Sequence, residues 1–338
     1  MINGISKLQD FVHEHRSNII VLADKHTLQD CYPLLEEELL HFIVPYGEGY
    51  KNLNSCEYIW KKLTEMGADR QTILLCLGGG VLCDMGAFAA GCFLRGIRTA
   101  LVPTSLLAMV DASTGGKNGV NFLGFKNYIG TLREADYTFI CTEFLKTLPY
   151  KEKVNGYVEM LKHGLISNAD HFNRVKYLFL KDNETLNEQL ILDSISIKQE
   201  HVSADFRDNG IRKRLNFGHT IGHAIESYSL AHSEENCELS HGISVALGIV
   251  VESYISAKKN GLPESELQEI TTVLQRIVSS VEDIPTYESL EPYLIKDKKN
   301  RNDQINFSLL NKIGESHHDF YIGEDTIREG IDFLQELR

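Results

Sequence analysis

Short apolar runs alternate with helix-like stretches over the first half of the chain. The apolar runs are partly β-branched and of strand length, which predicts β-strands at residues 18–23, 41–44, 72–77, 99–102 and 137–141. Two helices are predicted between them, at residues 33–40 and 53–66, and Gly67 gives the second a stop signal. Such alternation predicts an α/β domain with a largely parallel sheet and helices on both faces.

Beyond residue 150 the hydrophobic pattern is helical nearly throughout. Apolar positions at helical spacing predict helices at residues 157–166, 185–202, 219–229, 242–259 and 264–280. We therefore expect two domains, an α/β domain at residues 1–150 and an α-helical domain at residues 151–338. A length of 338 residues agrees with about two domains, each with its own core.

Composition restricts the partners. The formal net charge of −13 argues against nucleic acid and anionic membranes, but it leaves room for a small anionic substrate. No apolar run has the length of a membrane span and no signal segment is visible, so we expect a cytoplasmic protein. The seven cysteines lack C-x-x-C spacing, which is typical of reduced packing residues.

A triple glycine follows one predicted strand directly. Gly78, Gly79 and Gly80 come after the run at residues 72–77, and a helical stretch follows them. A strand that enters such a turn presents bare backbone N–H groups and a helix N-terminus to an anion, as at a nucleotide phosphate. A tight strand–helix turn without a ligand explains the same pattern, so both interpretations stay open here.

A second glycine-rich stretch carries lysines. Lys117 follows Gly115 and Gly116 directly, and Lys126 with Asn127 comes shortly after. A single lysine of this kind is usually a solvated surface charge. Two of them in an apolar, glycine-rich stretch favour bound phosphate.

Histidines at helical spacing suggest a metal. His219 and His223 lie four residues apart, so on a helix both would share one face. Glu159 and His241 are further donors, and a set of two histidines and one glutamate leaves a fourth position open, as in catalytic zinc sites. The alternative is a coincidental polar pair.

Several motifs together resemble 3-dehydroquinate synthase, in the same order and at similar spacing. They lie at residues 78–84, 95–96, 102–108, 110–117, 159–164 and 215–224, and the resemblance runs from about residue 46 to about residue 315. It implies a Rossmann-like NAD-binding domain, a helical metal-binding domain and a homodimer. The implied cofactors are NAD and Zn²⁺, with Co²⁺ as a possible substitute.

The family pattern implies roles for individual residues. The zinc ligands would be Glu159, His219 and His241, while His223 would contact the substrate phosphate instead. The NAD contacts would be Asp24, Glu48, Lys51, Gly79, Gly80, Val81, Asp84, Thr104, Ser105, Lys126, Phe144 and Thr147.

The pattern also implies a substrate site. Its residues would be Asp111, Lys117, Asn127, Lys162, Lys198, Arg212 and Asn216, with Arg95 of the partner subunit reaching in. A late lysine run brings one more lysine to the phosphate, either Lys298 or Lys299. The ligand would be a small phosphorylated sugar acid.

The implied reaction belongs to the shikimate pathway. 3-Deoxy-D-arabino-heptulosonate 7-phosphate cyclises to 3-dehydroquinate with loss of phosphate, through a transient oxidation by NAD. Departures from the family pattern, such as Ile243-Ser244 in place of Glu-Ala, keep a cyclase of sedoheptulose 7-phosphate as an alternative. Two further hypotheses stay open, a metal-dependent alcohol or glycerol dehydrogenase and a catalytically dead binding protein.

Overall fold

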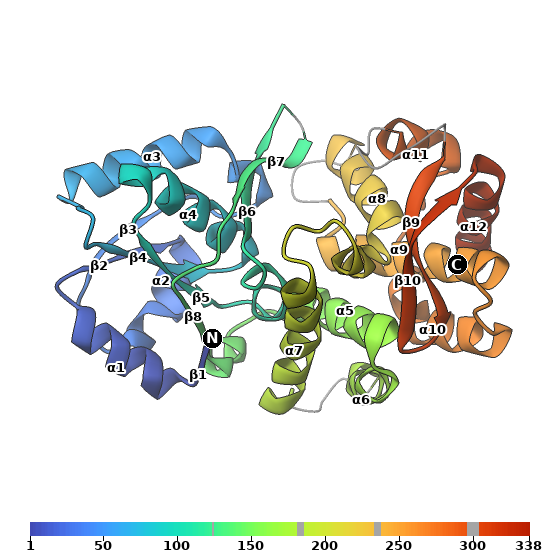
Figure 1. Cartoon of the computed structure of the whole chain (residues 1–338), viewed down its shortest axis with the longest axis horizontal. Helices are drawn as coiled ribbons and strands as arrows, with labels where there is room; N and C mark the ends of the chain where they lie inside the picture. The colour runs from blue at the N-terminus through green and yellow to red at the C-terminus, as the bar shows by residue number, and fades with distance from the viewer. Residues whose placement is uncertain (124, 181–185, 233–237, 296–303) are drawn as a thin grey trace. The chain divides into compact units, whose positions relative to one another are not determined.

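The computed structural model describes residues 1–123, 125–180, 186–232, 238–295 and 304–338 (Figure 1). The chain forms two compact units, Met1–Gly156 and Tyr157–Arg338, each described by itself below. None of the helices within the described ranges combines the length and hydropathy of a transmembrane span.

The first unit is built on a six-stranded parallel sheet. Its strand order is β1-β8-β5-β4-β2-β3, where β1 is Ile2–Asn3, β2 Ile19–Ala23, β3 Leu40–Ile43, β4 Ile73–Gly78, β5 Arg98–Pro103 and β8 Tyr137–Ile140. Strands β2 and β4 are buried along their whole length, as expected for the centre of a parallel sheet. The predicted α/β class and its five strands are confirmed, with ends shifted by at most one residue.

Helices α1 (Ile5–His15), α2 (Lys25–Asp30), α3 (Leu53–Glu65) and α4 (Gly80–Cys92) pack on this sheet. The hairpin of β6 (Lys117–Phe122) and β7 (Phe125–Leu132) packs against α4. Helix α4 lies close to β4, because a Cβ at Gly86 would sit 2.4 Å from Cys76 Sγ. Its apolar residues join α3 in the core, with Ile59 and Met85 among those fully buried. Helix α4 begins at Gly80, two residues after β4 ends at Gly78.

The predicted helix at residues 33–40 is wrong. The chain makes only a short 3₁₀ turn, η1 (Tyr32–Leu35), and Glu36 then adopts a left-handed conformation with φ 56°. The Tyr32 hydroxyl accepts the Leu39 N–H at 2.8 Å, which closes the loop and leads into β3 at Leu40. A side-chain hydrogen bond, which the spacing of apolar residues does not reveal, thus ends the helical pattern early.

The described residues of the second unit are helical, as predicted, apart from one antiparallel hairpin. Its elements are α5 (Tyr150–Ser167, which begins in the first unit), α6 (Ala169–Leu180), α7 (Glu188–Ala204), α8 (His219–His232), α9 (His241–Lys259), α10 (Glu264–Val278), α11 (Tyr287–Leu294), α12 (Glu324–Glu336), β9 (Ile305–Lys312) and β10 (Glu315–Ile322). Helix α9 is buried over most of its length and packs against α8, α10, α12 and β9.

Helices α8 and α9 approach each other at glycines. A Cβ at Gly248 would lie 2.0 Å from Gly218 O, and one at Gly222 would lie 3.0 Å from Ser244 O. Gly218 also has φ 79°, a left-handed conformation that favours glycine. These contacts fix the first turn of α8 against α9. Two of the candidate metal ligands, His219 and His241, are the first residues of these helices.

Candidate active site

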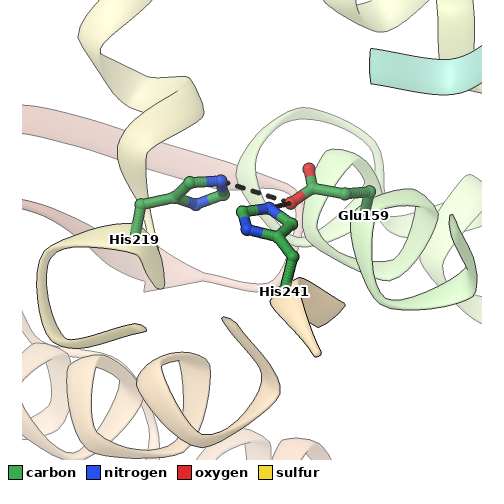
Figure 2. A group of neighbouring side chains, drawn as sticks. All are labelled: Glu159, His219 and His241. Carbon is green, nitrogen blue, oxygen red and sulfur yellow. Dashed lines mark ion pairs between the residues drawn. The ribbon is translucent and has the colours of Figure 1, made fainter. Parts of the chain in front are cut away.

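Three side chains of the second unit converge on one point (Figure 2). Glu159 comes from α5, His219 is the first residue of α8 and His241 is the first residue of α9. Glu159 Oε1 lies 3.3 Å from His219 Nε2 and 3.7 Å from His241 Nε2. Their potential ligand atoms all lie within 4.8 Å of one another.

This geometry fits a tetrahedral cation. Ligands at about 2.0–2.1 Å from a tetrahedral zinc ion are separated from each other by roughly 3.3–3.4 Å, close to the two distances measured at Glu159 Oε1. The Glu159 carboxylate is completely buried, and neither oxygen makes a well-aligned hydrogen bond to the described residues. A buried carboxylate that faces two imidazole nitrogens offers the donor set of a catalytic metal site.

A buried ammonium group stands beside this cluster. Lys162 Nζ lies 2.5 Å from Glu159 Oε2, and both side chains are almost fully buried. Burial raises the pKa of Glu159, but the charge of Lys162 and the nearby His219 outweigh burial and hold that pKa well below its usual range. The carboxylate is therefore kept in the charged form that a cation requires.

The two imidazoles differ in electrostatics. Burial and the charge of Lys162 lower the pKa of His219. Burial also acts to lower the pKa of His241, but the carboxylates of Glu159 and Glu226 outweigh it and raise that pKa to about 10. The difference arises because His241 lies between two carboxylates.

His223 lies beside the two candidate ligand histidines. Its ring centroid is 5.0 Å from that of His219 and 5.9 Å from that of His241, and the residue is exposed. The structure groups His223 instead with Glu226 and His241. The spacing of four residues therefore places both histidines on one face of α8, but His219 is the one that faces Glu159.

A buried carboxylate supports the start of α8. Glu252, from α9, is fully buried and accepts the N–H groups of Gly218 at 2.7 Å and Ile221 at 3.0 Å. Burial raises the pKa of Glu252 to about 8, although these donors oppose the shift.

Sequence reasoning missed Glu226 and Glu252. Their only local signal is an acidic residue inside an apolar helical stretch.

The other predicted substrate residues of this unit lie on α7 and the 3₁₀ helix η6 (Ile211–Asn216). Lys198 and Arg212 are both buried, and Arg212 Nη1 donates to Phe206 O at 2.7 Å. Asn216 ends η6, three residues before His219. Lys298 and Lys299 lie outside the described residues.

In the first unit a buried lysine joins two predicted sites. Lys51 Nζ donates to Asp84 Oδ2 and to Asn127 Oδ1, both at 2.6 Å. Asn121, which sequence reasoning missed, donates to Glu48 Oε1 at 2.9 Å and accepts the Asn127 N–H at 2.9 Å. Predicted NAD contacts and a predicted substrate contact thus share one hydrogen-bonded network across α4 and the β6–β7 hairpin.

The glycine turn leads from β4 into α4. Gly79 is the N-cap of α4, and a Cβ there would meet Ser105 Oγ at 3.5 Å. Gly80 is tighter, since a Cβ would lie 3.3 Å from Ala112 Cβ. Val81 follows in the first turn, and Thr104 comes directly after β5. Backbone N–H groups at this helix start are the donors expected for a phosphate.

The remaining predicted residues of the first unit lie on several of its elements. Asp24 caps α2 and accepts the N–H groups of His26 and Thr27. Lys126 Nζ lies 3.7 Å from Glu48 Oε1. Phe144 is buried, whereas Lys117 and Arg95 are exposed, and Arg95 has φ 67°. Asp111 lies in a π-helical turn, η4 (Ala108–Ala112). Thr147 follows the 3₁₀ helix η5 (Thr142–Lys146).

Solved structures share this fold. 2-Deoxy-scyllo-inosose synthase, in complex with carbaglucose-6-phosphate, NAD⁺ and Co²⁺, matches with a TM-score of 0.85 and 25% identity over 98% of this chain and 95% of its own. 2-Epi-5-epi-valiolone synthase from Streptomyces hygroscopicus, with NAD⁺ and Zn²⁺, matches with a TM-score of 0.83 and 22% identity over 95% of this chain and 92% of its own. The chain has the fold of the sugar-phosphate cyclases.

Sequence comparison narrows this class. Two family models match, described as 3-dehydroquinate synthase N-terminal at residues 41–155 and 3-dehydroquinate synthase C-terminal at residues 156–300. A 3-dehydroquinate synthase from Parabacteroides distasonis is 38% identical over 342 residues, covering 98% of this chain and 95% of its own length. The chain belongs to the 3-dehydroquinate synthase family.

Proposed function

We propose that this protein is a 3-dehydroquinate synthase. It would cyclise 3-deoxy-D-arabino-heptulosonate 7-phosphate to 3-dehydroquinate and release phosphate, as a step of the shikimate pathway in the cytoplasm. The observation that carries the proposal is the convergence of Glu159, His219 and His241, beside the buried Lys162, in a chain of this family.

Two bound groups supply the central chemistry. Bound NAD would supply reversible hydride transfer, and bound Zn²⁺, or Co²⁺ in its place, would supply Lewis acidity at the hydroxyl to be oxidised. Glu159, His219 and His241 would hold the metal, and the glycine turn at residues 79–84 would hold the pyrophosphate. The α/β domain would thus be the NAD-binding domain and the helical domain the metal- and substrate-binding domain.

The cations of the chain would bind the two acidic ends of the substrate. Lys117, Asn127 and His223 would hold the phosphate, and Arg212 with Lys198 would hold the carboxylate through parallel charge-assisted bonds. Asp111, Lys162 and Asn216 would complete this site, with Arg95 of the partner subunit in a homodimer. A simple alcohol carries no phosphate, so a dehydrogenase acting on it would not need so many phosphate-binding groups.

A cyclase of sedoheptulose 7-phosphate is the second candidate. The departure from the family pattern at Ile243-Ser244 favours it. That sugar lacks the carboxylate at C1, so a site built for the carboxylate would lose its charge-assisted bonds to the substrate. Loss of such substrate contacts costs several powers of ten in specificity.

The test compares the two sugars with NAD and zinc present. We expect phosphate release from the heptulosonate phosphate and almost none from sedoheptulose 7-phosphate. Arg212→Ala should severely reduce the first activity, while Lys213→Ala, next to it and paired with the exposed Asp319, serves as the control. Comparable turnover of both sugars would favour the second candidate, and sustained NADH formation from a simple polyol would favour a dehydrogenase.

A further inference from the structure

Glu226 stands behind one of the candidate metal ligands. It lies on α8, two helical turns after His219, and its side chain is buried. Its Oε2 is 3.5 Å from His241 Nδ1, while the opposite nitrogen, His241 Nε2, faces Glu159 Oε1 at 3.7 Å. The His241 ring therefore lies between two carboxylates, one at each nitrogen.

The second imidazole has a different neighbour. His219 Nδ1 lies 3.2 Å from the backbone oxygen of Phe217, and its Nε2 faces Glu159. Both rings thus present Nε2 to the same carboxylate oxygen and Nδ1 to an acceptor behind them. The acceptor is a neutral carbonyl for His219 and a buried carboxylate for His241.

We infer that Glu226 is a positioning residue that sets the tautomer and orientation of His241 for metal binding. The inference rests on the metal site of the proposed function. A neutral imidazole has one N–H and one lone pair, so an acceptor at Nδ1 directs the lone pair at Nε2 toward the metal. Outer carboxylates of this kind raise the basicity of the ligand, and their loss typically weakens metal binding by roughly 10–100-fold.

A second metal ion is the rival explanation for Glu226. His223, Glu226 and His241 also bring potential ligand atoms within 4.8 Å of one another. However, His241 Nε2 is already directed at Glu159, so a second ion at Nδ1 would require an imidazole bound at both nitrogens. His223 is also exposed. The geometry therefore favours one ion supported by Glu226.

The test is metal binding by the full-length protein after removal of metal with a chelator. Titration with Zn²⁺ against a competing chelator, and with Co²⁺ by its visible absorption, gives affinity and stoichiometry independently of activity. We expect one ion per chain in the wild type and in Glu226→Gln, with roughly 10–100-fold weaker binding in the variant. Glu238→Gln removes an exposed charge three residues before His241 and should bind as the wild type does.

The outcomes separate the two explanations. Binding by Glu226→Gln within threefold of the wild type, with unchanged thermal unfolding of the metal-free protein, would overturn the inference. Two ions in the wild type and one in the variant would make Glu226 a ligand and also overturn it. A wild type without measurable metal affinity would refute the metal site itself, and the role of Glu226 with it.

Discussion

Replacement of Glu252 by leucine should destabilise the start of α8. The side chain is fully buried and accepts the N–H groups of Gly218 and Ile221, which lie on either side of His219 in sequence. Leucine keeps most of the volume and removes both acceptors. A buried donor left without a partner costs about 1–3 kcal/mol, so two cost about 2–6 kcal/mol.

One effect acts against this loss. Burial raises the pKa of Glu252 to about 8, which means that the carboxyl group itself is unfavourably desolvated. Leucine removes that cost, so we expect a net loss near the lower end, about 2–3 kcal/mol of unfolding free energy. This is a large part of the roughly 5–15 kcal/mol typical of a folded protein.

The assay is urea unfolding followed by far-UV circular dichroism. The matched control is Ser253→Ala, since Ser253 is equally buried but its hydroxyl makes no hydrogen bond to the described residues. We expect the control to change stability by under about 1 kcal/mol. If Glu252→Leu lost no more than the control, the carboxylate would not support α8, and this interpretation of the α8–α9 junction would be wrong.

Three further predictions test other parts of the structure. His219→Ala should lose the metal, whereas His223→Ala should retain it and lose activity; equal metal loss in metal analysis of both would show that they bind the ion together. Gly79→Val should weaken NAD binding measured by calorimetry far more than Gly79→Ala, because only the smaller side chain fits the 3.5 Å contact with Ser105 Oγ. Burial lowers the pKa of His171 to about 4. The unfolded chain therefore binds more protons than the folded chain between about pH 6.5 and 4. The stability that is present above pH 6.5 is lost as the pH falls through that range. This loss amounts to at most about 3 kcal/mol, and His171→Leu should remove it from the pH dependence of urea unfolding; an unchanged slope would contradict the assignment.

Local patterns predicted those parts of the fold that local physics determines. Buried strands such as β2 and β4 are continuous apolar runs in the sequence, and the turn at Gly79 follows from the glycines themselves. The helix expected at residues 33–40 failed because the Tyr32 hydroxyl binds the backbone of Leu39, a contact between residues seven positions apart.

In the candidate active site, too, some residues could be predicted from the sequence, whereas others depend on contacts between distant parts of the chain. Family resemblance named Glu159, His219 and His241, and the structure brings these three together. It did not name Glu252, which lies 34 positions after Gly218 and reaches it only because Gly248 lets α8 and α9 approach closely. The support of Glu252 for α8 depends on packing between helices, and no spacing along the chain encodes that packing.

The most direct measurement follows phosphate release from 3-deoxy-D-arabino-heptulosonate 7-phosphate by the metal-depleted protein with NAD, while Zn²⁺ is added in fractions of an equivalent. The proposed function predicts that activity rises from near zero and saturates at one zinc per chain, without accumulation of NADH, because the hydride is returned in each turnover. Phosphate release that is independent of zinc, or NADH that accumulates with each turnover, would contradict it.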